Sequence, residues 1–301
     1  MSEAKSKAQV FGARLFSTLL LIGIVAGTFV SMNPWAYLSL VSFLAIAASH
    51  ELFRMMDIGK MPCQQKWGRF VAIAYTLTVA ALLASCGGDA LPLLGFVDGT
   101  AITLVVLSSF ILQLREPIEG RNPLIKVAST VLSFLYVPFL FSFIGRLLFV
   151  PEAASVSSFF HDVPGAMVML WLICVTKFTD IGAYCTGSLI GKHKMIPHIS
   201  PGKTWQGFFG ALVWAVVVGC VVYAIGKDSL QVLGGWGHVV VLSLILSLLT
   251  VTGDLAESVI KRSLEVKDSG NTLPGIGGAL DLIDSLCFTA PALYFYLCWV
   301  V

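Results

Sequence analysis

Charged residues are scarce in this sequence. Only 12% of its 301 residues are Asp, Glu, Lys or Arg, whereas 57% are apolar. A typical soluble domain has about 25% charged residues. The 19 basic and 17 acidic side chains are too few to cover the surface of a soluble globule of this length. The composition therefore excludes a disordered chain, a soluble enzyme and a nucleic-acid-binding protein.

The sequence also lacks paired cysteines and internal repeats. Its seven cysteines form no CxxC pair, and most of them lie inside apolar runs, where cysteine behaves as a small hydrophobic residue. Neither a disulfide framework nor a zinc site is indicated. Without a repeat, the pattern gives no support to a transporter built from inverted repeats.

Long apolar runs dominate what is present. A membrane-crossing helix needs about 20 mainly apolar residues, and the chain offers about nine such runs. The expected spans are 13–32, 34–52, 68–86, 97–114, 124–149, 163–186, 204–226, 236–260 and 283–301. The sequence thus predicts an all-α, polytopic membrane protein with about nine transmembrane helices.

The basic residues predict the orientation of these spans, because Lys and Arg collect in cytoplasmic connections. All of the 19 Lys and Arg except Arg146, Lys177 and Lys227 fall on one side of the nine-span arrangement. Arg146, near the end of the span 124–149, and Lys227 fall on the other side, and Lys177 falls within a span. The N-terminus is therefore expected in the cytoplasm and the C-terminus on the far side.

Ionisable residues inside the spans gather in the C-terminal half. We expect residues 1–160 to form transmembrane helices with little chemistry of their own, and residues 161–301 to carry the ionisable groups toward the cytoplasmic side. His50 and Glu51 close the second span, where an interfacial position is expected. Three pairs with i,i+3 spacing mark the C-terminal half: Lys177 with Asp180, Asp254 with Glu257, and Asp281 with Asp284.

This spacing places both members of each pair on one helix face. Like-charged carboxylates repel, and a bound cation or a raised pKa relieves the repulsion. Oxygen ligands without nearby His or Cys favour Mg²⁺ or Mn²⁺ over zinc. The alternative, that these are ordinary helix-end carboxylates at a wet interface, stays open on spacing alone.

Two expected cytoplasmic connections bring glycine, lysine and hydroxyl groups to the same side. The first holds Gly187, Gly191-Lys192 and the run 200–204, Ser-Pro-Gly-Lys-Thr, directly before a span. Ser200 is a candidate N-cap with a proline in the first turn, so free N–H groups and Lys203 could hold a phosphate. The Walker A spacing is missing.

The second connection combines basic residues, a glycine turn and an acidic pair. It contains Lys261-Arg262, Lys267-Asp268 and the run 274–278, Pro-Gly-Ile-Gly-Gly, before Asp281 and Asp284. This combination indicates metal–phosphate chemistry rather than a proton relay.

Two ordered motifs in these segments resemble the phosphatidate cytidylyltransferase family, also called CDP-diacylglycerol synthases. The C-terminal family signature appears as Ser258-Val-Ile-Lys261-Arg262, Lys267-Asp268, the 274–278 turn, and Asp281-Leu-Ile-Asp284. The upstream motif is found in residues 180–207 as Asp180-Ile-Gly-Ala-Tyr, Gly187, Gly191-Lys192, Ser200-Pro, Lys203-Thr204 and Gly207. Matching motifs span 177–285, whereas the N-terminal portion matches only in being apolar.

The resemblance implies transfer of CMP from CTP to phosphatidate, giving CDP-diacylglycerol and pyrophosphate, at the cytoplasmic membrane face. It implies a bound Mg²⁺ on Asp254, Asp281 and Asp284, which would be catalytic together with Lys261, and a possible second cation such as K⁺. The substrate-binding residues that it implies are Ser200, Lys203, Thr204, Ser258, Arg262, Lys267, Asp268, Asp180 and Lys192. It also implies a homodimer in a lipid bilayer, in which residues 1–160 form a scaffold that contributes the oligomer contact and residues 161–301 form the catalytic transmembrane domain with its active site at the cytoplasmic side.

Four positions depart from the family pattern. Gly202 replaces a lysine, Gln206 a glutamate, Ile276 a histidine and Leu282 an arginine. If positions 202 and 206 lie on one helix, the lysine and glutamate of the family pattern would form a salt bridge there. Both partners of that salt bridge are then absent from this sequence, so no unpaired charge is left. The loss of His and Arg beside the acidic pair bears on which groups hold CTP and on which nucleotide or lipid is preferred.

Two other functions remain as alternatives. The departures suggest an inactive or altered-substrate relative, and intramembrane charges also occur in transporters and channels. The charges here gather near one face with phosphate-type loops, whereas a transporter is expected to hold them at the midplane. The short N-terminus and the lack of a targeting segment fit a multi-pass protein of a bacterial inner membrane.

Overall fold

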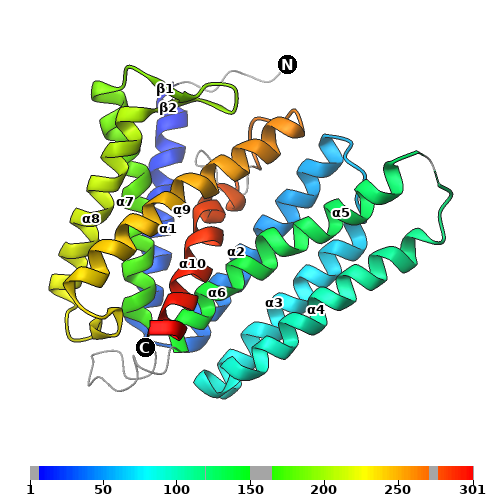
Figure 1. Cartoon of the computed structure of the whole chain (residues 1–301), viewed down its shortest axis with the longest axis horizontal. Coiled ribbons are helices and arrows are strands. Elements are labelled where there is room, and N and C mark those ends of the chain that lie inside the picture. The colour runs from blue at the N-terminus through cyan, green and yellow to red at the C-terminus, as the bar shows by residue number, and fades with distance from the viewer. Residues whose placement is uncertain (1–6, 119, 150–164, 271–276, 301) are drawn as a thin grey trace.

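The computed structural model describes residues 7–118, 120–149, 165–270 and 277–300, and most of this part is helical (Figure 1). The α-helices are α1 Lys7–Ser31, α2 Pro34–Ile58, α3 Gln65–Cys86, α4 Ala90–Gln113, α5 Asn122–Phe134, α6 Leu140–Arg146, α7 Ala166–Ile190, α8 Trp205–Ile225, α9 Trp236–Ser263 and α10 Ala279–Val300. Short 3-10 turns cover Gly87–Asp89, Leu147–Phe149 and Gln231–Leu233.

Within the described residues, each expected span lies mainly in helix, but several helices run further than the apolar run that predicted them. The second expected span ends at 52, whereas α2 continues to Ile58 through Arg54 and Asp57. A hydropathy count stops at the first charge. A helix does not, because long polar side chains reach the interface while the backbone hydrogen bonds continue.

Within the described residues, seven helical segments are long and apolar enough to cross a membrane. One of them, Gln65–Gln113, contains both α3 and α4, which two expected spans had covered separately. Another, Asn122–Phe149, runs through α5 and α6. The protein is therefore a multi-helix protein of membrane type, and the count of nine spans stays a prediction.

A single π-helical turn, η2 Leu135–Phe139, joins α5 to α6 and contains Pro138. Proline lacks an N–H and cannot donate to the carbonyl four residues earlier. The wider turn accommodates this loss without ending the helix.

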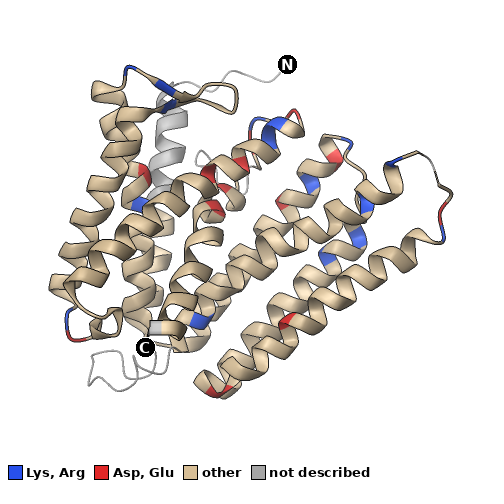
Figure 2. Ribbon diagram, viewed as in Figure 1, with Lys and Arg blue, Asp and Glu red and all other residues tan. Residues whose placement is uncertain are grey.

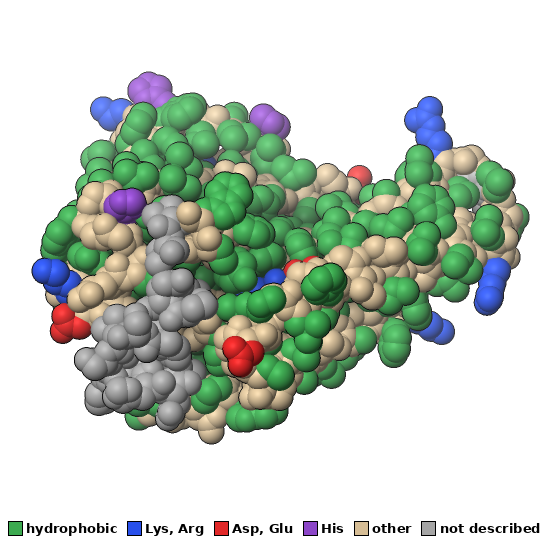
Figure 3. All heavy atoms as spheres, turned by 60° about the horizontal axis from the view of Figure 1, so that its bottom comes forward, with side chains coloured by type: hydrophobic (Ala, Val, Ile, Leu, Met, Phe, Trp, Pro, Cys, Tyr) green, Lys and Arg blue, Asp and Glu red, His purple; other side chains and the backbone are tan. Residues whose placement is uncertain are grey.

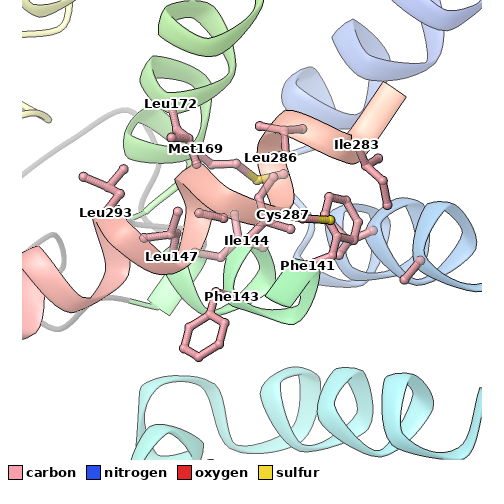
Figure 4. Close-up of a cluster of buried hydrophobic side chains, with 14 of the residues drawn as sticks. Phe141, Phe143, Ile144, Leu147, Met169, Leu172, Ile283, Leu286, Cys287 and Leu293 are labelled. Carbon is pink, nitrogen blue, oxygen red and sulfur yellow. The ribbon is translucent and has the colours of Figure 1, made fainter. Parts of the chain in front are cut away.

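A shared core joins the two halves of the chain. Apolar side chains from α6, the 3-10 turn that follows it, α7 and α10 meet in it, among them Ile144, Leu147, Leu172 and Leu286 (Figure 4). All four are at most 6% exposed. Helix α10 lies between α6 and α9 (Figure 1), so residues before 160 pack directly on the last helix.

Arg146 lies in helix, within the expected span 124–149, and its side chain is buried. It lies in α6, 3% exposed, and forms two hydrogen bonds of 2.7 and 2.8 Å with the carboxylate of Asp98 on α4. Tyr75 and Ser142 complete this network. The pairing neutralises a buried cation that would otherwise be costly.

The surface and the charges are arranged as a membrane protein requires. Apolar side chains cover much of the face in Figure 3. Most Lys and Arg gather at the end of the bundle that carries the strands, and the acidic residues of α9 and α10 lie close to that end (Figure 2).

A β-hairpin departs from the expected all-helical backbone. Strands β1 Lys194–Ile196 and β2 Ser200–Thr204 pair antiparallel, with Ile196 opposite Ser200. The prediction that Ser200 caps a helix was wrong. The cap of α8 is Thr204, whose Oγ1 accepts a hydrogen bond from Gly207 N at 3.1 Å.

The hairpin also overturns the helical premise for positions 202 and 206. Gly202 lies in β2 and Gln206 in the first turn of α8, so the two do not share one helix. Gln206 Oε1 instead accepts hydrogen bonds from the backbone N–H groups of Lys192 and His193 at 3.1 and 3.2 Å. This residue anchors the entry to the hairpin.

Candidate functional site

Three carboxylates meet where α9 contacts α10. Asp254 and Glu257, one turn apart on α9, lie on one face, and Asp284 approaches from the second turn of α10. One oxygen from each carboxylate lies within 4.8 Å of the others. Carboxylate oxygens at this spacing are the ligands that Mg²⁺ prefers.

The close approach of the two helices depends on Gly253. A Cβ at this position would lie 2.8 Å from Ser285 Cα and 2.9 Å from Asp284 O. Any side chain would therefore push α10 away from α9. Glycine brings Asp284 into range of the α9 carboxylates.

Burial makes it costly in free energy for the carboxylate cluster (Asp254, Glu257 and Asp284) to carry several negative charges. Glu257 is 3% exposed and Asp284 5%. Glu257 Oε1 is buried and has no hydrogen-bond partner among the described residues. Because carboxylates repel one another strongly in such surroundings, the cluster calls for a cation between its oxygens or a proton on one of them.

Two lysines supply positive charge from the edges. Lys203 Nζ lies 2.7 Å from Asp254 Oδ2, and Lys261 Nζ lies 3.0 Å from Glu257 Oε2. Lys261 also forms an ion pair with Asp281. A third lysine, Lys177 on α7, donates a hydrogen bond to the carbonyl of Leu282 at 2.8 Å.

Asp281 has a different environment from the other two expected metal ligands. Its carboxylate pairs with Lys261 and accepts hydrogen bonds from Ser269 Oγ and Gly278 N, both at 2.7 Å. The bond from Gly278 N is the contact that an acidic residue in the first turn makes in a capping box. Asp281 therefore closes the N-terminus of α10, and its role as a metal ligand stays a prediction.

A cavity of about 520 Å³ lies beside the cluster, between α7, the hairpin, α8 and α9. Its polar wall includes the predicted residues Asp180, Ser200, Lys203, Thr204 and Asp254. Aromatic side chains, among them Tyr184 and Phe208, also line it. A cavity of this size suits a ligand with one charged end, and Lys203 and Asp254 join it to the carboxylate cluster.

The remaining predicted residues lie around this centre. Lys192, Arg262, Lys267 and Asp268 are exposed and do not line the cavity, and Ser258 is half-buried on α9. Arg262 Nε donates a hydrogen bond to the carbonyl of Ile199 at 3.3 Å, which ties the end of α9 to the hairpin. The turn at 274–276, with the departure at Ile276, lies outside the described residues.

Two acidic residues near the site were not predicted to belong to it. Glu257 was visible as the i,i+3 partner of Asp254, but the family motif does not single it out. Glu51 on α2 accepts a hydrogen bond from Leu280 N at 2.9 Å. No sequence signal connects two residues 229 positions apart.

Comparisons with known proteins agree with these motifs. A model of the cytidylyltransferase family matches residues 12–300. A phosphatidate cytidylyltransferase of Staphylococcus haemolyticus (strain JCSC1435) is 32% identical over 291 residues, 97% of each chain. One of Mycobacterium bovis is 30% identical, over 94% of this chain and 85% of the relative.

The similarity is strongest in part of the chain. A phosphatidate cytidylyltransferase of Brucella suis biovar 1 (strain 1330) is 43% identical over 146 residues, which is 48% of this chain. The chain matches about half the length of that relative, 52%.

Proposed function

Because the chain belongs to the cytidylyltransferase family, we propose that it transfers CMP from CTP to phosphatidate, giving CDP-diacylglycerol and pyrophosphate. The observation that supports this most is the buried carboxylate cluster, joined through the Lys203–Asp254 ion pair to a cavity of about 520 Å³. The names of the relatives supply the two substrates.

The reaction exchanges one phosphoanhydride bond for another. A phosphate oxygen of the lipid forms a bond to the α-phosphorus of CTP while the bond from that phosphorus to the oxygen bridging to the β-phosphorus breaks, and pyrophosphate leaves with that oxygen. Catalysis of such a transfer is mainly positioning and charge stabilisation. Lys203 and Ser200, both at the cavity wall, would bind phosphate oxygens, and Lys261 would stabilise charge at the edge of the cluster.

The carboxylate cluster fits a divalent cation, because it leaves the buried Glu257 Oε1 without a partner. Asp254, Glu257 and Asp284 would hold Mg²⁺ there, and Asp281 would join them if Lys261 released it. When bound, Mg²⁺ neutralises phosphate charge and orients the reactants. A second cation such as K⁺ remains part of this proposal.

The membrane setting matches the chemistry, because one substrate is a lipid and the other is water-soluble. We place the protein in a bacterial inner membrane as about nine spans, with the N-terminus and the site on the cytoplasmic side and with a homodimer as the assembled form. The basic residues at the hairpin end of the bundle (Figure 2) support this orientation.

Purified protein in detergent, given labelled CTP, Mg²⁺ and phosphatidate, should form labelled CDP-diacylglycerol. Asp254→Asn should reduce the rate at least about a hundredfold, the scale expected for loss of a main electrostatic contact in a transfer site. Asp228→Asn is the matched control, because Asp228 is exposed on the connection after α8. Its rate should equal that of the wild type.

The same assay decides between this function and the alternatives. A folded protein that makes no CDP-diacylglycerol, but transfers a nucleotide to another lipid phosphate, would be an altered-substrate relative. A folded protein with no transfer would be an inactive relative or a transporter. Normal turnover by Asp254→Asn would refute the assigned site.

A further inference from the structure

Glu51 lies outside every segment that carries the predicted site, yet its carboxylate contacts the N-terminal end of α10, the helix that carries Asp281 and Asp284. It is on α2, near the end that carries the hairpin, and it is 3% exposed. Its surroundings come from the stretch before α10 and from the first turn of α10. An ordinary interfacial glutamate would instead extend into water.

Two glycines of that stretch press directly on the carboxylate. A Cβ at Gly270 would lie 2.3 Å from Glu51 Oε1, and one at Gly278 would lie 2.4 Å from Glu51 Oε2. Neither position has room for a side chain. The carboxylate of Glu51 therefore lies against the backbone at both Gly270 and Gly278.

Glu51 also binds the helix end itself. Its Oε2 accepts a hydrogen bond from Leu280 N at 2.9 Å. Leu280 is the second residue of α10, where N–H groups have no partner within the helix. A negative charge at this end is further stabilised by the helix dipole.

Two carboxylates from distant parts of the chain thus accept hydrogen bonds from backbone N–H groups at the N-terminus of α10. Asp281 accepts the bond from Gly278 N, and Glu51 accepts the bond from Leu280 N. The same turns carry Asp281 toward Lys261 and Asp284 toward the carboxylate cluster. A shift of this helix end would move both aspartates away from α9.

We propose that Glu51 is a positioning residue of the site, which holds the first turn of α10 in place from the N-terminal half of the protein. This inference rests on the proposed function for its effect on turnover, but not for the contact itself. It also implies that the helices before residue 160 do more than form a scaffold.

The test combines turnover with hydrogen exchange in detergent. Glu51→Ala should lower kcat at least about tenfold while the KM for CTP changes less than about twofold, because the cavity is formed by other elements. The Leu280 amide should exchange at least about tenfold faster, whereas amides of residues 290–297 keep their protection. Glu51→Gln keeps an acceptor oxygen, so its kcat should stay within about threefold of the wild type.

Asp57→Ala is the matched control, because Asp57 lies on the same helix and its carboxylate accepts a hydrogen bond only from the side chain of Gln65 among the contacts of the described residues. If Glu51→Ala unfolds, Glu51→Asp replaces it, since its shorter side chain withdraws the oxygen and should lower kcat by a similar factor. Unchanged exchange at Leu280, or a kcat equal to that of Asp57→Ala, would overturn the proposal. Wild-type protein that exchanges as described but makes no CDP-diacylglycerol would refute only the proposed function.

Discussion

At the scale of single residues, Asp284 shows what the site requires of the fold. Its carboxylate is 5% exposed, and no Lys or Arg forms a salt bridge with it in the described part of the chain. It accepts a hydrogen bond from Ser285 N at 2.6 Å, which satisfies only part of its capacity. A buried carboxylate beside two others opposes folding until a cation binds.

Asp284→Asn should therefore stabilise the metal-free protein while it abolishes activity. We expect the midpoint of thermal unfolding in EDTA to rise by a few degrees, corresponding to about 1 kcal/mol or more. Added Mg²⁺ should raise the midpoint of the wild type but not that of the variant. Differential scanning fluorimetry in detergent measures both effects.

Asp228→Asn serves as the reference, because it removes a carboxylate from an exposed connection. Its midpoints of thermal unfolding in EDTA and in Mg²⁺ should equal those of the wild type. A lower midpoint for Asp284→Asn in EDTA would show that this carboxylate stabilises the fold by itself. The cluster would then be a structural network rather than a cation site.

At the scale of elements, the crossing of α9 and α10 depends on one glycine. Gly253→Ala places a methyl group against the backbone of Ser285, about 1 Å closer than atoms normally approach. Overpacking of this kind typically costs about 1–3 kcal/mol. The variant should unfold at a lower temperature and need at least about tenfold more Mg²⁺ for half-maximal activity.

Gly237→Ala provides the contrast on the same helix. A Cβ at Gly237 meets nothing within 4 Å, and alanine favours helix over glycine by about 0.5–1 kcal/mol. This variant should be at least as stable as the wild type, with an unchanged Mg²⁺ requirement. If Gly253→Ala were as stable as Gly237→Ala and needed no more Mg²⁺, the crossing of α9 and α10 would not depend on Gly253.

The elements also show how far sequence reasoning reaches. Apolar runs located the helices, because burial in lipid imposes a composition that is visible along the chain. The hairpin was missed, because the run 200–204 has proline and glycine and reads equally well as a loop before a helix. Its pairing with Lys194–Ile196 depends on the tertiary context of both segments, which no local sequence pattern specifies.

The site was predictable in the same uneven way. Motif spacing identified Asp254 and Asp284, and the structure brings their oxygens together with Glu257. Motifs did not reveal that Asp281 closes a helix end, because that depends on Ser269 and Gly278 folding back onto it. Glu51 was unreachable from sequence, since a contact across 229 positions depends on how α2 packs against α10.

At the scale of the whole molecule, the distribution of charge predicts how the bundle sits in a membrane. The hairpin, with Lys194 and Lys203, lies at one end of the bundle, whereas Lys227 lies at the opposite end (Figures 1 and 2). Lys and Arg are retained on the cytoplasmic side during insertion. The end that carries the hairpin, and with it the carboxylate cluster, should therefore face the cytoplasm.

Cysteine labelling tests this orientation directly. In a variant whose seven cysteines are replaced, a single cysteine is introduced by His198→Cys in the hairpin or by Asp228→Cys after α8, both exposed positions. A maleimide that cannot cross the inner membrane is added to intact bacterial cells whose outer layer it can pass. It should label the cysteine at position 228 and not the one at position 198. Both should react after detergent is added, which controls for reactivity. The reverse pattern would put the carboxylate cluster on the side of the membrane that CTP does not reach. Labelling of both positions in intact cells would place the hairpin and the connection after α8 on one side of the membrane. A membrane-spanning α8 does not allow that arrangement.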